Sequence, residues 1–140
     1  MNKDSPVLLI EDEKITQIMT QEAFKTLNIS NPLKIVENGH DAITFLNDPS
    51  LDLPCLILLD LHMPLMNGVE FLQIIKSDDI LKQIPVAVLT ASNTAKDIMD
   101  SYELEVTHYF VKPAGHQAFT KLISSLDTYL TYNRQSSPVS

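Results

Sequence analysis

Short apolar runs recur along the chain, and each is bounded by polar or turn-forming residues. They occupy positions 7–10, 33–36, 56–59, 86–89 and 109–111. Three of these runs show no alternation of apolar and polar positions, which is typical of strands in a parallel sheet that is covered on both faces. The pattern therefore predicts five short strands, most of them buried.

Segments with helical spacing of apolar residues follow the strand-like runs. They cover positions 15–27, 42–46, 69–75 and 119–130. The first stripe comprises Ile15, Ile18, Met19, Ala23 and Leu27, and the last comprises Phe119, Leu122, Ile123, Leu126 and Leu130. A more polar stretch, 94–102, begins at Thr94 with Asp97 three residues later, as in a capped helix start. The periodicity predicts five amphipathic helices.

Strand and helix thus alternate five times, which indicates βαβ units and a mostly parallel sheet. Right-handed crossovers and five strands favour an α/β, doubly wound, flavodoxin-like sheet with strand order 2-1-3-4-5. We expect one domain over residues 1–132, followed by a flexible tail over 133–140.

Composition excludes several classes of function. The chain has 140 residues, only three glycines and one cysteine, Cys55. The widely separated glycines cannot form a Gly-rich nucleotide loop, and a single cysteine cannot form an intramolecular disulfide. No apolar run approaches the roughly 18 residues of a membrane span, and acidic residues begin too early for a signal peptide. A net charge of −8 argues against nucleic-acid binding. We expect a cytoplasmic protein that binds neither DNA nor membranes.

Chemically active side chains follow the predicted strands, at the end of the sheet where such folds bind ligands. They are Glu11 and Asp12 after the first strand, Asp60 after the third, Thr90 after the fourth and Lys112 after the fifth. The first and third strands are neighbours in the expected order, so their three carboxylates must face one another. This placement predicts an acidic cleft.

Carboxylates in such a cleft repel each other by roughly 3 kcal/mol per pair at about 5 Å. A cation offsets this repulsion, and the candidates are Mg²⁺ and Lys112. An Asp carboxylate is also a nucleophile in phosphoryl transfer, a role that Asp60 can take. Lys112 and the Thr90 hydroxyl can then neutralise and hydrogen-bond the transferred oxygens.

Four blocks of the sequence together resemble the receiver domains of two-component response regulators. They are the acids 11–12, the segment DLHMPLMNG at 60–68, VLTAS at 88–92 and YFVKP at 109–113. They occur in the family's order and spacing, and the resemblance covers residues 6 to about 130. The residues at 97–98 and 100–104 also resemble stand-alone receivers that partner bacterial phytochrome-type kinases.

The resemblance implies a role for each matched position. Asp60 would accept a phosphoryl group from a sensor histidine kinase or a phosphotransfer protein. Mg²⁺ would be held by Glu11, Asp12, Asp60 and the backbone carbonyl of His62. Thr90 and Lys112 would bind the phosphoryl group, Tyr109 would follow Thr90 as the switch aromatic, and Lys112–Pro113 would be a cis peptide. The helix at 94–102, the last strand and the last helix would form the output surface, used for partner binding or for a homodimer. The chain would be a signalling protein, not an enzyme acting on other substrates.

Several positions qualify this expectation. Ala114 and Gly115 stand where many family members have a large apolar residue, which predicts a less rigid start of the last helix. His62 and Ser92 occupy the positions that in this family tune the lifetime of the acyl phosphate. Tyr102, Tyr129 and Tyr132 are candidate interface aromatics on the output surface, although packing at the edge of the core explains them equally well.

Three alternative functions remain open at this stage. A Mg²⁺-dependent phosphatase or phosphotransferase with an aspartyl nucleophile is one, although the first strand ends in EDE rather than the D-x-D of haloacid-dehalogenase-type enzymes. A flavodoxin-like FMN binder has the same strand order, but the chain lacks its Ser/Thr/Gly-rich phosphate loop. A degenerate receiver that binds partners without phosphate is the third. Asp60, Thr90 and Lys112 argue against it.

Overall fold

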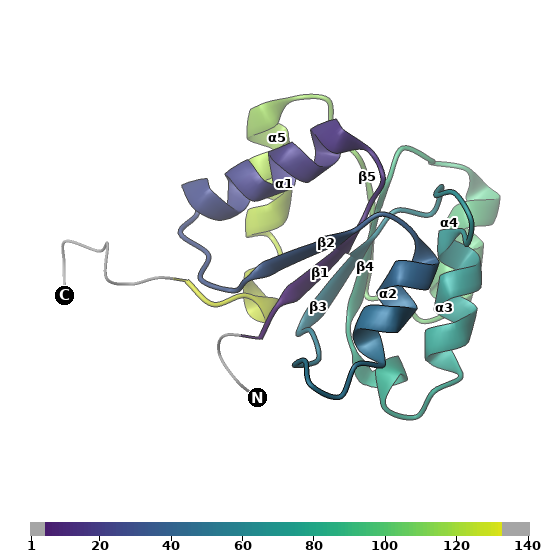
Figure 1. Cartoon of the computed structure of the whole chain (residues 1–140). Coiled ribbons are helices and arrows are strands. Elements are labelled where there is room, and N and C mark those ends of the chain that lie inside the picture. Colours follow the sequence, from purple (N-terminus) through teal and green to yellow (C-terminus); the bar gives the residue numbers. More distant parts are fainter. Residues whose placement is uncertain (1–4, 133–140) are drawn as a thin grey trace.

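The computed structural model describes residues 5–132, and the expected tail at 133–140 lies outside them (Figure 1). Five parallel strands form one sheet in the order β2-β1-β3-β4-β5, which confirms the predicted fold class. The strands are β1 (Val7–Ile10), β2 (Leu33–Val36), β3 (Leu56–Leu59), β4 (Val86–Thr90) and β5 (His108–Val111). β1 pairs with β3 so that Ile10 lies opposite Leu59, which brings the residues after both strands to the same edge.

Within residues 5–132, five helices cover the two faces of the sheet (Figure 1). They are α1 (Lys14–Thr26), α2 (Gly39–Leu46), α3 (Gly68–Lys76), α4 (Ala95–Glu103) and α5 (His116–Ser124). Short 3-10 turns occur at Leu81–Gln83 and Asp127–Tyr129. α1 and α5 lie on one face, and α2, α3 and α4 lie on the other. Among the described residues, no helix combines the length and apolar character needed to cross a membrane.

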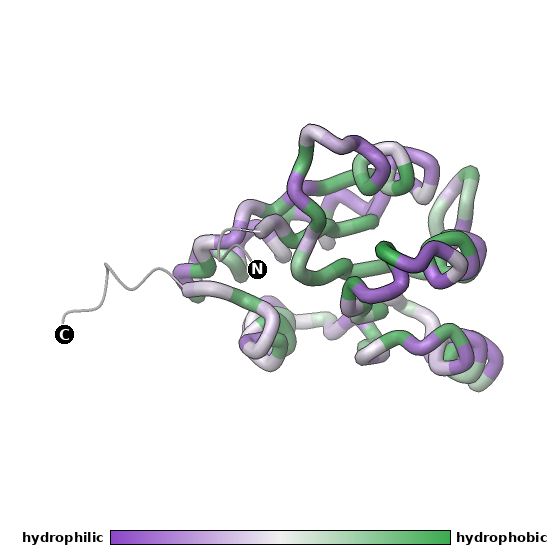
Figure 2. The backbone as a smooth tube through the Cα atoms, turned by 90° about the horizontal axis from the view of Figure 1, so that it is seen from below, coloured by the Kyte–Doolittle hydropathy of each residue, from purple (hydrophilic) through white to green (hydrophobic). Residues whose placement is uncertain are grey.

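The core consists of two apolar layers, one on each face of the sheet. Alternate strand residues such as Leu8, Ile57 and Val88 pack toward α2 and α3. Their neighbours in sequence, such as Leu9 and Leu58, pack toward α1 and α5. Hydrophobic and hydrophilic positions alternate along the helices that cover these layers (Figure 2). Burial on both faces explains why the central strands read as continuous apolar runs.

The predicted apolar stripe of α1 is partly wrong. Ile15 and Ile18 are 58% and 47% exposed, whereas Thr16, Gln17 and Thr20 are buried on the same helix. The buried polar groups are satisfied, since Gln17 Nε2 donates to the Glu11 carbonyl at 2.8 Å and Thr20 Oγ1 donates to the Thr16 carbonyl at 2.8 Å. Hydrogen bonds therefore set the buried face of α1, and periodicity alone does not reveal them.

The last helix ends earlier than its apolar stripe predicts. α5 stops at Ser124, and Leu126 still enters the core from the turn that follows. The chain then runs to an isolated antiparallel bridge between Tyr132 and Ile29. Tyr129 packs edge-on against His108, with ring centroids 6.0 Å apart. Tyr129 and Tyr132 thus pack near the amino-terminal ends of the strands, and Tyr102 is the candidate aromatic that is exposed on α4, at 52%.

Candidate functional site

The three predicted carboxylates converge at the carboxyl end of the sheet. Glu11, Asp12 and Asp60 each offer one oxygen, and these oxygens all lie within 4.8 Å of one another. Glu11 is 0% exposed and Asp60 is 6% exposed, while Asp12 is open to solvent. The acidic cleft predicted from the strand order is therefore present.

Lys112 places its ammonium group inside this acidic cluster. Its Nζ atom lies 2.9 Å from Glu11 Oε1, 3.5 Å from Asp60 Oδ2 and 3.2 Å from Glu13 Oε1. The Lys112 side chain is only 15% exposed. Glu13 is a partner of Lys112 that was not predicted from the sequence, although its place directly after Asp12 was a usable signal.

Burial and charge shift the pKa values of these groups in different directions. Desolvation raises the pKa of Glu11 to about 7, against the hydrogen bond from Lys112, and the Asp60 charge adds to the increase. Burial lowers the pKa of Lys112, but its hydrogen bond to Glu11 and the charge of Asp60 outweigh this and raise it overall. The Thr16 hydroxyl and then Lys112 lower the pKa of the exposed Glu13 carboxylate.

The cluster has the donor set that suits a hard divalent cation. Mg²⁺ binds a small number of carboxylate oxygens and retains water molecules, and the solvent-facing Asp12 leaves room for such water. Two buried acids balanced by a single lysine also leave excess negative charge at this point. The residues present therefore fit Mg²⁺, with Glu11, Asp12 and Asp60 as the ligand side chains.

Asp60 is held by two hydrogen bonds to the same oxygen. The fully buried Thr90 hydroxyl donates to Asp60 Oδ1 at 2.8 Å, and the His62 backbone N–H donates to it at 3.1 Å. The other oxygen, Oδ2, faces Lys112. Thr90 and Lys112 are thus brought to Asp60 as the sequence predicted.

Tyr109 connects β5 to the loop after β4. Its hydroxyl donates to the Ser92 carbonyl at 2.8 Å, and its ring is half-buried against the core layer of α2 and α3. Burial is the largest cause that raises the pKa of Tyr109, so its hydroxyl stays protonated as a donor at neutral pH. The aromatic expected to follow Thr90 is therefore bonded to the same loop that Thr90 begins.

Asp97, at the start of α4, links the loop that carries Asp60 to the loop after β4. Its Oδ2 atom accepts a hydrogen bond from the Ser92 hydroxyl and lies 3.1 Å from His62 Nε2. The Ser92 bond is the largest cause that lowers the pKa of Asp97. Thr94 was predicted to cap this helix, and Thr94 Oγ1 does accept from the Asp97 N–H at 3.2 Å. The contact between Asp97 and His62, which lies 35 residues away, was not predicted.

The expected cis peptide at Lys112–Pro113 is wrong for this structure, because the described residues contain no cis peptide bond. The trans form of an X–Pro bond is favoured by about 0.5–1 kcal/mol when nothing else intervenes. With the trans peptide, Lys112 still reaches Glu11 and Asp60.

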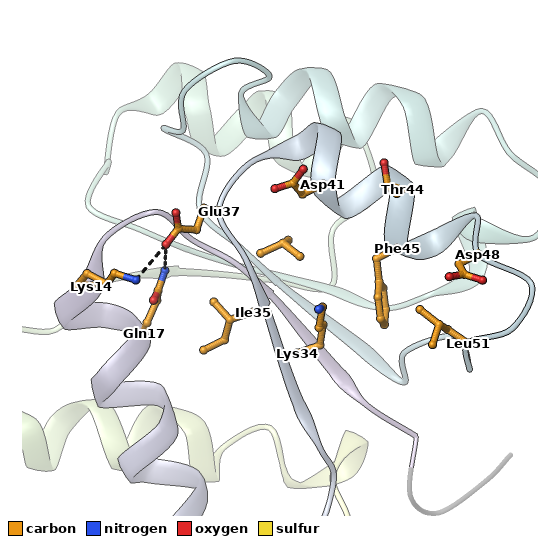
Figure 3. A pocket seen from close by; sticks show the side chains of 11 residues that line it. Lys14, Gln17, Lys34, Ile35, Glu37, Asp41, Thr44, Phe45, Asp48 and Leu51 are labelled. Carbon is orange, nitrogen blue, oxygen red and sulfur yellow. Dashed lines mark hydrogen bonds and ion pairs between the residues drawn. The ribbon is translucent and has the colours of Figure 1, made fainter.

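A separate hollow of about 660 Å³ lies beside the edge strand β2 (Figure 3). Lys14 and Gln17 on α1 both contact Glu37 there, at 3.3 and 3.1 Å. None of the carboxylates of the acidic cluster lines this hollow. The chemistry predicted from the sequence is therefore located at the strand ends rather than in this hollow.

Comparison with known proteins agrees with this geometry. The sequence model of the family described as the response regulator receiver domain matches residues 7–124, and the chain belongs to this family. It is 37% identical over 135 residues to the response regulator Rcp1 of Synechocystis sp., covering 91% of this chain and 90% of that protein. It is 30% identical over 136 residues to the probable methanogenesis regulatory protein FilR2 of Methanothrix harundinacea, covering 94% and 88%.

Two solved structures are similar over most of both chains. The Mn²⁺-bound form of Rcp1 has a TM-score of 0.81 and 34% identity, covering 97% of each chain. The phosphorylated cyanobacterial phytochrome response regulator RcpA has a TM-score of 0.83 and 33% identity, covering 89% of this chain and 92% of that one. Because the chain belongs to the receiver family, the phosphatase and FMN-binder alternatives no longer apply. The remaining alternative is a degenerate receiver that binds partners without phosphate.

Proposed function

We propose that this receiver domain is phosphorylated on Asp60 by a sensor histidine kinase or a phosphotransfer protein, in a Mg²⁺-dependent reaction. One observation carries the proposal. Asp60 is buried at the base of an acidic cluster, with Oδ1 held by Thr90 and Oδ2 facing Lys112. This is the arrangement that a nucleophilic carboxylate needs, because donors stand ready for the oxygens of the incoming group.

The chain's own residues account for the transfer. An Asp60 oxygen forms a bond to phosphorus while the bond between phosphorus and the donor's histidine nitrogen breaks, and the electron pair of that bond stays with the imidazole. The Thr90 hydroxyl and the Lys112 ammonium group then leave the Asp60 carboxylate and bind the oxygens of the phosphoryl group. Glu11, Asp12, Asp60 and the backbone carbonyl of His62 would hold Mg²⁺, which would supply positive charge to those oxygens.

This change of hydrogen-bond partner by Thr90 also provides a switch. When Thr90 turns its hydroxyl to the phosphoryl group, the loop that begins with Thr90 changes its contacts, and Tyr109 is bonded to that loop through Ser92. The signal then reaches the surface formed by α4, β5 and α5. Met99 and Tyr102 on this surface are 63% and 52% exposed, which suits binding of a partner protein or a homodimer. No DNA or membrane contact is part of this function, and a cytoplasmic location fits a kinase-linked switch.

We further propose that the kinase that donates the phosphoryl group is of the phytochrome type. The support is the similarity to RcpA, described as a phytochrome response regulator, at 33% identity. A bacteriophytochrome response regulator, RtBRR, is also similar, with 35% identity and a TM-score of 0.78 over 96% of this chain.

Intact-mass analysis after incubation with acetyl phosphate tests the proposed chemistry. We expect one phosphoryl adduct in the presence of Mg²⁺, none with EDTA, and none in an Asp60→Asn variant. Asp52→Asn is the matched control, because Asp52 is an exposed acid that lies outside the acidic cluster. Stable labelling of the Asp60→Asn protein would contradict the assignment. No adduct in the wild type and no Mg²⁺ binding would favour the degenerate receiver.

A further inference from the structure

A closed ring of contacts joins Asp60 to Asp97. Asp60 Oδ1 accepts from the His62 N–H at 3.1 Å and from the Thr90 hydroxyl at 2.8 Å. The side chains of His62 and Ser92 both end at Asp97 Oδ2, and the Ser92 N–H returns to Thr90 Oγ1 at 3.5 Å. Asp97 is the member of the ring that lies on α4 rather than at the ends of β3 and β4.

The ring joins the two loops next to the Asp60 carboxylate. Asp60 directly follows β3 and is only 6% exposed, so a water molecule that attacks a phosphoryl group on it has to come past these loops. His62 lies two residues after Asp60, whose Oδ1 accepts from its N–H, and Ser92 lies two residues after Thr90, which donates to the same oxygen. Asp97 contacts both of them and holds the two loops together.

We propose that Asp97 is a positioning residue that fixes His62 and Ser92 beside Asp60 and thereby slows hydrolysis of the aspartyl phosphate. This inference rests on the proposed function, since it concerns the same phosphorylated Asp60. In the hydrolysis, the oxygen of water bonds to phosphorus and the bond from phosphorus to Asp60 breaks. Asp60 leaves as a carboxylate, and the proton of water passes to the released phosphate or to solvent. Excluding or misaligning that water lengthens the life of the phosphorylated state.

His62 has space to move if the contact with Asp97 is lost. Its side chain is 64% exposed, and it borders a cleft of about 330 Å³ between α3 and α4. The Asp97 side chain is 20% exposed and accepts two contacts on one oxygen. Truncation of Asp97 therefore releases both bordering side chains, whereas truncation of either one releases a single side of the bridge.

The test is the rate at which the phosphoryl adduct decays. The full chain is phosphorylated with acetyl phosphate and Mg²⁺, the donor is removed, and the adduct is followed by intact mass. We expect the adduct of Asp97→Ala to decay at least about fivefold faster than that of the wild type. Asp100→Ala is the matched control, since it removes a carboxylate from the same helix, paired with Lys96 at 2.7 Å, and it should decay at the wild-type rate.

A variant background separates positioning from a general effect on the fold. In a His62→Ala, Ser92→Ala protein the contacts of Asp97 with these two side chains are already gone, so adding Asp97→Ala should change the decay no further. Equal acceleration in both backgrounds, or wild-type decay in Asp97→Ala, would overturn the inference. If Asp97→Ala does not fold by circular dichroism, Ser92→Ala alone should accelerate decay, and an unchanged rate there overturns the inference as well.

The two proposals fail in different ways. A wild-type chain that forms no adduct contradicts phosphorylation of Asp60 and with it the role of Asp97. A wild-type adduct that depends on Asp60, together with no effect of Asp97 on its decay, contradicts only the positioning role.

Discussion

Lys112 Nζ lies 2.9 Å from Oε1 of Glu11, whose side chain is only 1% exposed. The two residues follow β5 and β1, which are separated by β3 and β4 in the sheet. Lys112 therefore reaches across the carboxyl ends of the sheet to supply the cation of the acidic cluster. Lys112 therefore has two roles that experiment can separate. It neutralises negative charge of the buried carboxylates, and it faces the Asp60 oxygen Oδ2, where it can bind an incoming phosphoryl group.

Lys112→Ala should separate metal binding from phosphorylation. Removing the ammonium group removes a cation from the cluster, so Mg²⁺ should bind at least as tightly as in the wild type, provided the pH is high enough to ionise Glu11, whose pKa Lys112 no longer lowers. Labelling by acetyl phosphate should become slower because the incoming oxygens lose their partner. Calorimetric titration with Mg²⁺ and intact mass measure the two effects. Lys121→Ala on the exposed side of α5 is the control, and weaker Mg²⁺ binding in Lys112→Ala would refute this division of roles.

Stability without divalent ions should fall as Glu11 ionises. Its pKa is raised from 4.5 to about 7 in the folded chain, so the folded state binds more protons than the unfolded state between these values. The contribution of Glu11 to the free energy of unfolding is therefore fully present below about pH 4.5 and is lost as the pH rises to 7, by about 3 kcal/mol.

Glu11→Gln lacks this dependence. In EDTA, its stability relative to the wild type should increase from pH 5 to pH 8, as measured by urea unfolding followed by circular dichroism. Glu13→Gln is the control, because the pKa of Glu13 is lowered and this carboxylate stays ionised across the whole interval. Parallel stability curves for the wild type and Glu11→Gln would show that Glu11 is not protonated in the folded state.

The positions of the strands and the acidic cluster could be predicted because both depend on short-range patterns. Each apolar run is a strand, and each acid directly follows its run, so the topology alone brings Glu11, Asp12 and Asp60 together. The face of α1 and the end of α5 were not predictable from periodicity. In α1, Gln17 is buried because it bonds to the Glu11 carbonyl, and in α5 the helix ends while Leu126 continues the apolar pattern.

Contacts between loops were the least predictable part of the site. Asp97 has a local role that the sequence reveals, since its N–H bonds to the Thr94 cap. Its contact with His62 depends on how two loops from different strands approach one another, and no local pattern encodes that distance. The peptide before Pro113 is trans, and the Lys-Pro pair alone does not determine which isomer a folded chain adopts.

Thr90 and Tyr109 should be coupled energetically. Tyr109→Phe removes the 2.8 Å bond to the Ser92 carbonyl, at a cost of about 1 kcal/mol, and Thr90→Val removes a buried donor to Asp60. Both bonds hold the loop after β4, so the double variant should lose less stability than the two single losses combined, by about 0.5 kcal/mol or more. Urea unfolding of the four proteins measures the difference. Thr90→Val combined with Tyr102→Phe on exposed α4 should be additive, and additivity in the Tyr109 cycle would argue against a coupled switch.

Gly68→Ala should disturb the loop that carries Asp60. A Cβ atom at Gly68 would lie 2.6 Å from Leu61 Cα and 2.8 Å from the Asp60 carbonyl oxygen, and neither backbone atom can move away without shifting the loop. We expect a loss of about 2 kcal/mol or more in the free energy of unfolding, with slower labelling of Asp60 by acetyl phosphate. Gly115→Ala is the matched control, because a Cβ there would meet no atom within 4 Å beyond its own residue and chain neighbours. Its effect should be limited to the weaker helix cap, about 1 kcal/mol or less, with labelling unchanged. Equal stability and labelling of the two variants would show that the loop yields freely and that Gly68 is not what holds Asp60 in place.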